Sequence, residues 1–99
     1  MKVIEDHIDQ LSKLCYLHKV DKMYLFGSAL RTDFQKHSDI DFVVKFKQID
    51  LATYFENYMA LKESLKNLFG REIVLLEEQT LKNPILMKAI DESKELIYG

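Results

Sequence analysis

Two aspartates stand one residue apart at the start of an apolar segment. Asp39 and Asp41 flank Ile40, and Phe42-Val43-Val44 follows with the composition of a strand. Because side chains two apart on a strand project from the same face, both carboxylates point the same way. Their repulsion is removed by a hard divalent cation with oxygen ligands, such as Mg²⁺ or Mn²⁺. An isolated Asp-x-Asp more often marks only the solvent face of a half-buried strand.

A Gly-Ser pair follows an earlier apolar run. Gly27 permits a tight turn and a close backbone approach to a ligand. If a helical turn begins at Ser28, its free backbone N–H groups and its hydroxyl can hold a phosphate oxygen. Arg31, one turn later, can add a charge-assisted contact to the same phosphate. Taken alone, the Gly-Ser pair is more often a plain loop.

Apolar periodicity predicts the elements that position these residues. Residues 3–19, 51–69 and the segment from Pro84 through Ile97 have helical spacing, and residues 23–26, 40–46 and 73–76 read as buried strands. Asp50 and Asn83 are the expected amino-terminal caps, and Gly70 is the expected helix end. Leu51, Tyr54, Phe55 and Tyr58 belong to one broad apolar helix stripe, and Glu77-Glu78 reads as a solvated strand end. The pattern favours a small α/β (α+β) fold: three core strands in a mixed sheet covered by helices.

Length and composition limit the possibilities further. The chain has 99 residues, 47% hydrophobic and 30% charged, which suits one globular domain over 1–99. A net charge of −2 gives no general attraction to nucleic acid or to an anionic membrane. Neither a membrane-spanning run nor a signal peptide is seen, and the single cysteine, Cys15, is expected to pack as a small hydrophobe. A cytoplasmic location is therefore expected.

The two chemical segments together are far more specific than either one. Gly27-Ser28, ten intervening residues and then Asp39-Ile40-Asp41, with an apolar strand before each half, resembles the signature of the DNA polymerase β-like nucleotidyltransferase superfamily. The chain is most similar to its minimal nucleotidyltransferases of the antitoxin type, small proteins often encoded beside a helical HEPN-type partner. The resemblance covers most of the chain, including the 51–69 helix and the Leu81-Lys82-Asn83-Pro84 entry into the last helix.

This resemblance implies roles for the residues of the motif. Gly27 and Ser28 would grip the nucleotide phosphates, and Arg31 would steady them. Asp39 and Asp41 would be the catalytic residues and would bind Mg²⁺ (or Mn²⁺). The implied reaction transfers a nucleoside monophosphate, most plausibly AMP from ATP, to a protein or small acceptor. A HEPN-type protein is the implied partner, and a homo-oligomer is left open.

One departure from the family favours an alternative. The family's third carboxylate, on the later strand, falls on Val74. Glu72 shares the face of Val74 and is the first candidate to replace the missing metal ligand, but it lies about 6.6 Å away along the strand. The alternative is therefore a catalytically weak or inactive nucleotidyltransferase-fold module that acts as an antitoxin-like partner of a HEPN-type protein.

Overall fold

The computed structural model describes residues 2–27 and 39–99, so the predicted phosphate ligands Ser28 and Arg31 lie outside the described residues. Within the described ranges the order of elements is α1 (Lys2–Glu5), α2 (Ile8–Leu17), β1 (Val20–Phe26), β2 (Ile40–Phe46), α3 (Leu51–Phe69), β3 (Ile73–Glu77), a 3₁₀ turn η2 (Glu78–Thr80), α4 (Pro84–Ser93) and β4 (Glu95–Tyr98). This is the mixed α/β architecture that the sequence predicts.

The strands form one mixed sheet with the order β3-β2-β1-β4. β1 runs antiparallel to β2 and to β4, whereas β2 and β3 are parallel. The prediction of three strands was therefore one short. Ile97 was placed in the terminal helix, but α4 ends at Ser93 and the chain becomes extended at Lys94 (φ −68°, ψ 147°) before it pairs with β1.

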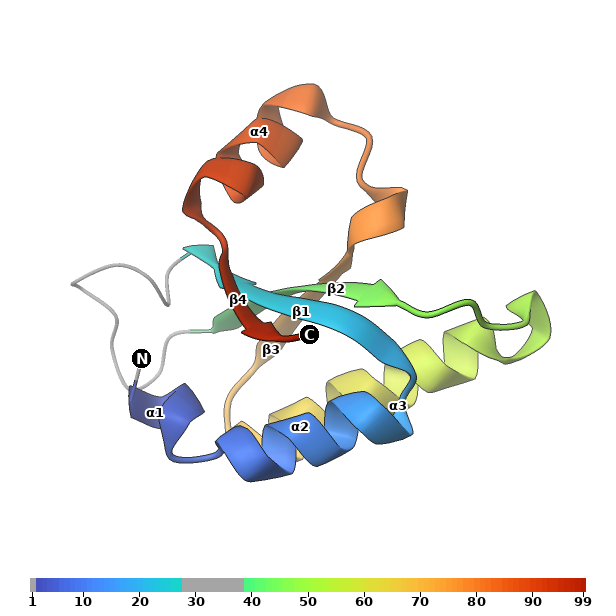
Figure 1. Cartoon of the computed structure of the whole chain (residues 1–99), viewed down its shortest axis with the longest axis vertical. Helices are drawn as coiled ribbons and strands as arrows, with labels where there is room; N and C mark the ends of the chain where they lie inside the picture. Colours follow the sequence, from blue (N-terminus) through green and yellow to red (C-terminus); the bar gives the residue numbers. More distant parts are fainter. Residues whose placement is uncertain (1, 28–38) are drawn as a thin grey trace.

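Helices cover the two faces of the sheet unequally, as Figure 1 shows: α1, α2 and α3 lie on one side and α4 on the other. The core fills the space between the sheet and α2 and α3. Its fully buried side chains include Leu11, Met23, Leu25, Phe42, Leu61 and Leu65. Since alternate strand residues face opposite ways, the even-numbered positions of β2 point into this core and the odd-numbered ones toward α4.

The predicted helix over residues 3–19 is broken at Asp6 and His7. His7 Nδ1 lies 2.9 Å from the carbonyl oxygen of Val3, and the His7 N–H bonds to the carbonyl of Ile4. Local hydrogen bonds of this kind compete with a continuous helix. Beyond the break, Cys15 is fully buried with Sγ 3.9 Å from Met23 Sδ, which confirms its expected packing as a small hydrophobe.

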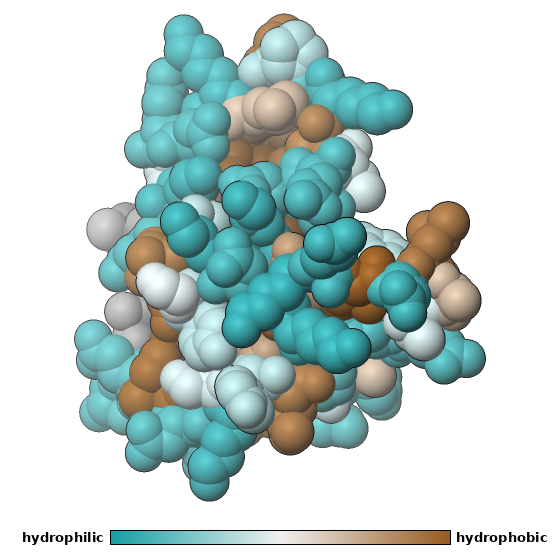
Figure 2. All heavy atoms as spheres, turned by 45° about the vertical axis from the view of Figure 1, so that its right-hand side comes forward, coloured by the Kyte–Doolittle hydropathy of each residue, from teal (hydrophilic) through white to brown (hydrophobic). Residues whose placement is uncertain are grey.

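α3 has the predicted bounds, but its apolar stripe is only partly buried. Leu61, Leu65 and Phe69 are buried, whereas Leu51 is 89% exposed and Phe55 is 68% exposed. The reason is visible in Figure 1, where the amino-terminal end of α3 extends past the strands. Figure 2 brings this side forward and shows hydrophobic atoms at the surface among hydrophilic ones.

The predicted helix ends are confirmed at two positions. Gly70 ends α3 in the left-handed conformation (φ 64°), and Asn83 Oδ1 accepts hydrogen bonds from the N–H groups of Ile85 and Leu86 at the start of α4. Asp50 does precede α3, but its side chain makes no capping hydrogen bond. Of the helices in residues 2–27 and 39–99, none has the length and apolar character needed to cross a bilayer.

Candidate active site

The end of β1 and the start of β2 bring Gly27 against Asp41. Phe26 is paired with Asp41 in the antiparallel ladder, and Gly27 follows with φ +72°. A Cβ atom added at Gly27 would overlap Oδ2 of Asp41 and stand only 3.2 Å from its Cγ. Glycine is therefore needed for two reasons: the left-handed backbone, and the space that the Asp41 carboxylate occupies. The two halves of the predicted motif are in contact.

The aspartate pair lies on the face of the sheet away from α2 and α3. Ile40 is fully buried in the core, so by strand alternation Asp41 projects from the opposite face, and Asp39 stands directly before β2 begins. Asp39 is exposed and Asp41 is half-buried. Two carboxylates beside Gly27 are a donor set that suits Mg²⁺ when substrate phosphates supply further oxygens. The residues present therefore fit the metal that the family implies.

Val74 occupies the position next to this pair on β3. The parallel register places Val74 opposite Asp41 and Ile73 opposite Ile40. Neighbouring strands are about 4.8 Å apart and paired residues share a face, so a carboxylate at position 74 would stand beside Asp41. Among the described residues, no three His, Cys, Asp or Glu side chains are grouped so that they could hold a metal ion.

Glu72, the candidate replacement, is engaged elsewhere. Its carboxylate lies 3.2 Å from Lys66 Nζ on α3, and its side chain is 70% exposed. Its carbonyl oxygen accepts a hydrogen bond from the Ile40 N–H at 3.1 Å, which fixes the backbone beside β2. This arrangement turns the Glu72 side chain toward α3 rather than toward Asp41.

Glu77 corrects another expectation. The Glu77-Glu78 pair was expected to be a solvated strand end, yet Glu77 is only 6% exposed and its Oε1 has no hydrogen-bond partner within the described part of the chain. Burial raises the pKa of Tyr54 on α3, and the negative charge of Glu77 raises it further. Glu77 thus faces α3, as its parity relative to Val74 predicts, and lies apart from the aspartate pair.

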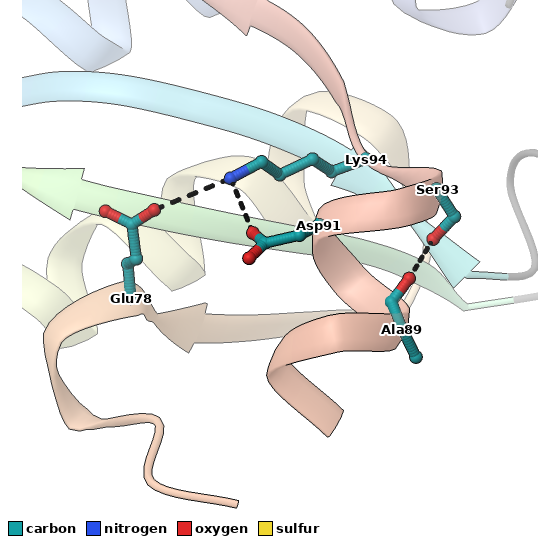
Figure 3. Close-up of polar contacts among 5 residues, drawn as sticks. All are labelled: Glu78, Ala89, Asp91, Ser93 and Lys94. Atoms are coloured by element: carbon teal, nitrogen blue, oxygen red, sulfur yellow. Dashed lines mark hydrogen bonds and ion pairs between the residues drawn. The ribbon is translucent and has the colours of Figure 1, made fainter. Parts of the chain in front are cut away.

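A polar cluster lies where α4 meets the sheet, and the three-residue spacing of Asp91 and Lys94 is its only signal in the sequence. Lys94 Nζ lies 2.9 Å from Asp91 Oδ1 and 3.7 Å from Glu78 Oε1, as Figure 3 shows. The same nitrogen is 4.3 Å from the centroid of the Tyr24 ring. The hydrogen bond to Asp91 raises the pKa of Lys94, so the amine is held as a cation. Lys94 therefore links α4, η2 and β1.

Solved structures share this arrangement of elements. A candidate minimal nucleotidyltransferase superposes with a TM-score of 0.78 at 22% identity, over 95% of this chain and 92% of that one. A toxin–antitoxin structure with AMP-PNP has a TM-score of 0.68 at 22% identity, over 93% and 73%. The tri-AMPylated Shewanella oneidensis HEPN toxin in complex with MNT antitoxin has a TM-score of 0.60 at 20% identity, over 96% and 71%. These likenesses confirm the nucleotidyltransferase fold.

Sequence comparison supports more than the fold. A candidate protein adenylyltransferase of Methanocaldococcus jannaschii is 35% identical over 99% of this chain and 99% of its own length. A second candidate protein adenylyltransferase of that organism is 35% identical over 82% of this chain and 78% of its own. Residues 9–99 match the family described as polymerase beta, nucleotidyltransferase. The chain therefore belongs to the polymerase beta nucleotidyltransferase family and shares the fold of a minimal nucleotidyltransferase.

Proposed function

We propose that this protein transfers AMP from ATP to a hydroxyl group of a protein acceptor, with Mg²⁺ bound by Asp39 and Asp41. The observation that carries the proposal is the contact between Gly27 and the Asp41 carboxylate. It joins the turn that can approach phosphates to the carboxylates that can hold their counter-ion. The similarity to candidate protein adenylyltransferases favours adenylyl transfer to protein over a small acceptor.

Each residue has a defined part in this reaction. Asp39 and Asp41 would hold the metal ion, and Gly27 leaves room for the phosphates to come close to these carboxylates. Ser28 and Arg31, which the structure does not describe, are proposed to bind the remaining phosphate oxygens. The acceptor hydroxyl oxygen attacks the α-phosphorus and its proton passes to solvent. The bond from the α-phosphorus to the α–β bridging oxygen breaks, and pyrophosphate leaves with that electron pair. Mg²⁺, when bound, neutralises the charge that accumulates on the phosphate oxygens.

The acceptor is proposed to be a HEPN-type toxin, with this protein as its antitoxin. Two structures with the same fold support this: a toxin–antitoxin with AMP-PNP, and an AMPylated HEPN toxin in complex with MNT antitoxin. Adenylylation of a toxin by its partner would make the antitoxin an enzyme rather than a stoichiometric blocker. Fewer antitoxin than toxin molecules would then suffice for protection.

Val74 favours a second candidate function, a weak or inactive transferase that acts by binding its partner. An apolar side chain stands opposite Asp41, and Glu72 is paired with Lys66. With two carboxylates rather than three, we expect one Mg²⁺ to accompany ATP and the second to be poorly held. Transfer would then be slow while nucleotide binding persists.

One pair of variants tests the site. Asp39→Asn with Asp41→Asn is expected to remove Mg²⁺-dependent ATP binding and AMP transfer without lowering the melting temperature, because two like charges are lost. Asp6→Asn with Asp9→Asn, at exposed positions on the helical side, is the matched control and should bind like wild type. Unchanged ATP affinity in the Asp39/Asp41 variant would refute the metal assignment. Binding without transfer to the HEPN-type protein would select the second candidate function.

A further inference from the structure

A cavity lies between α4 and the face of the sheet that carries Asp41. It has a volume of 170 Å³, close to that of about six molecules of liquid water. Four apolar side chains and two carboxylates line it: Val43, Leu81, Met87, Ile90, Glu78 and Asp91. Apolar walls with a few polar groups are typical of a site for a flat ring, since the walls cover its faces and the polar groups contact its edge.

The position of the cavity relative to the aspartates matches the shape of a nucleotide. Val43 lies two residues after Asp41 on β2 and on the same face, an offset of about 7 Å along the strand. Tyr24 pairs with Val43, and Phe26 pairs with Asp41, so this spacing is kept on the neighbouring strand. If the α-phosphate lies at Asp41, the ribose covers the interval and the base reaches Val43.

The polar groups beside the cavity have a defined order of donors and acceptors. Glu78 and Asp91 line the cavity, and Lys94 Nζ lies 3.7 Å from the first carboxylate and 2.9 Å from the second, as drawn in Figure 3. Glu78 offers acceptors next to the ammonium group, which offers donors. The side chain of Glu78 is 33% exposed and that of Asp91 is 66% exposed, so Glu78 is the more enclosed carboxylate.

Adenine matches this order along one edge. Its exocyclic amino group is a donor, and the adjacent ring nitrogen is an acceptor. An oxo group at the same position would place an oxygen against the Glu78 carboxylate, and the protonated ring nitrogen beside it would face the Lys94 ammonium. A base with an oxo group and a protonated ring nitrogen would therefore be repelled by both Glu78 and Lys94.

We propose that this cavity is the nucleobase site and that it selects adenine, with Glu78 accepting from the amino group and Lys94 donating to the ring nitrogen. The inference rests on the proposed function, because it places the phosphates at Asp41. It assigns α4 a part in choosing the nucleotide. A purely structural role for Lys94, holding α4 on the sheet, would affect all nucleotides alike.

The experiment compares ATP with inosine triphosphate, in which an oxo group replaces the amino group and the ring nitrogen is protonated. Binding is measured by calorimetry with Mg²⁺ for wild type and for Glu78→Leu. We expect wild type to bind ATP at least about tenfold more tightly than inosine triphosphate, as for loss of a hydrogen bond to a charged group. Glu78→Leu should lower ATP affinity and raise inosine triphosphate affinity, because the accepted hydrogen bond and the repulsion of the oxo group are both lost, so the preference for ATP should shrink. Glu92→Leu, an exposed acid of α4 outside the cavity, should keep the preference.

A second variant addresses Lys94. Lys94→Met should reduce the preference for ATP, and Lys94→Arg should restore part of it. Equal affinity of wild type for both nucleotides would overturn the nucleobase site, as would equal losses for both in Glu78→Leu. In either case, binding that still depends on Asp39 and Asp41 would leave the proposed function intact. If neither nucleotide nor inorganic triphosphate binds wild type, both the nucleobase site and the proposed function are wrong.

Discussion

Gly27 shows how a missing side chain determines the geometry of the carboxylate next to it. Its φ of +72° and the overlap of a Cβ with Asp41 are separate constraints, and Gly70 has only the first. At Gly70, φ is +64°, but a Cβ would have no neighbour within 4 Å. A substitution at Gly70 would therefore show the cost of backbone strain alone, whereas one at Gly27 would add the displacement of the Asp41 carboxylate.

We predict that Gly27→Ala and Gly70→Ala both lower the free energy of unfolding by about 1–2 kcal/mol, the cost of a left-handed residue with a Cβ. Gly27→Ala should lose more, because Asp41 must also move, and only this variant should weaken Mg²⁺-dependent ATP binding. Urea unfolding and ATP titration measure the two effects. Equal ATP affinity in both variants would mean that the position of Asp41 is unimportant for binding.

The position opposite Asp41 can be tested by supplying the absent acid. Val74→Asp should destabilise the metal-free protein by about 1–3 kcal/mol, because a half-buried carboxylate is placed beside another. Mg²⁺ with ATP should recover part of this loss and raise the rate of AMP transfer. The matched control is Leu76→Asp, on the same face but opposite Val43, which should be destabilised with no recovery by Mg²⁺.

A variant at Glu72 tests whether position 74, rather than Glu72, is the place of the third carboxylate. Glu72→Gln should leave transfer almost unchanged, because its carboxylate pairs with Lys66 at an exposed site and such pairs contribute little. If Glu72→Gln abolishes transfer and Val74→Asp adds nothing, Glu72 rather than position 74 supplies the third ligand.

At the scale of the elements, the sequence was sufficient to predict a strand or a helix end where apolar composition or a capping residue marks it locally. The strands over 40–46 and 73–76 are apolar, and Asn83, Pro84 and Gly70 mark helix ends by their own chemistry, so these predictions were confirmed with small shifts. β4 was missed because Glu95–Tyr98 is a short edge strand whose first two side chains are exposed. Its extended state comes from pairing with β1, a contact across most of the chain.

The same distinction applies to the candidate site. It could be predicted that Gly27 ends one strand and that Asp41 begins another. The pairing of β1 with β2, which brings the two residues together, could not be predicted from local patterns. The Lys94 cluster could not be predicted, since Tyr24, Glu78 and Asp91 come from three elements whose packing no local pattern records. The burial of Glu77 likewise comes from tertiary packing, since its charge is close enough to Tyr54 of α3 to raise the pKa of that phenol.

The stability of α4 depends more on its amino-terminal cap than on the burial of its side chains. Only Ile90 of this helix is buried, and Asn83 Oδ1 accepts two of the first backbone N–H groups. Asn83→Ala should therefore lower the free energy of unfolding by about 1 kcal/mol. Ser93→Ala, which removes the hydrogen bond from Ser93 Oγ to the Ala89 carbonyl seen in Figure 3, is the control and should have little effect. Urea unfolding checks both, and equal losses would contradict a special role of the cap.

At the scale of the whole molecule, stability depends on the layer between the sheet and the helices on its core side. Cys15 of α2 and Met23 of β1 meet there with both side chains fully buried. Burial raises the pKa of the Cys15 thiol from 9.0 to about 12, because a thiolate would be deprived of water. The folded protein thus holds a proton that the unfolded chain loses at lower pH.

The sign of the resulting pH dependence follows from proton counting. Below pH 9.0 the thiol is protonated in both states and contributes no slope, whereas between 9.0 and about 12 only the folded state keeps the proton. Wild type should therefore lose stability by about 1.4 kcal/mol per pH unit in this window.

Cys15→Ala lacks the thiol and is expected to be less stable at pH 7, because it leaves a small cavity. The difference between the two proteins should shrink as pH rises from 9 to 11. Tyr54 and Tyr58, whose pKa values burial also raises, are present in both proteins and cancel in the difference. Urea unfolding at a series of pH values measures the difference in free energy of unfolding between wild type and Cys15→Ala. A difference that stays constant with pH would show that the thiol does not titrate as a buried group.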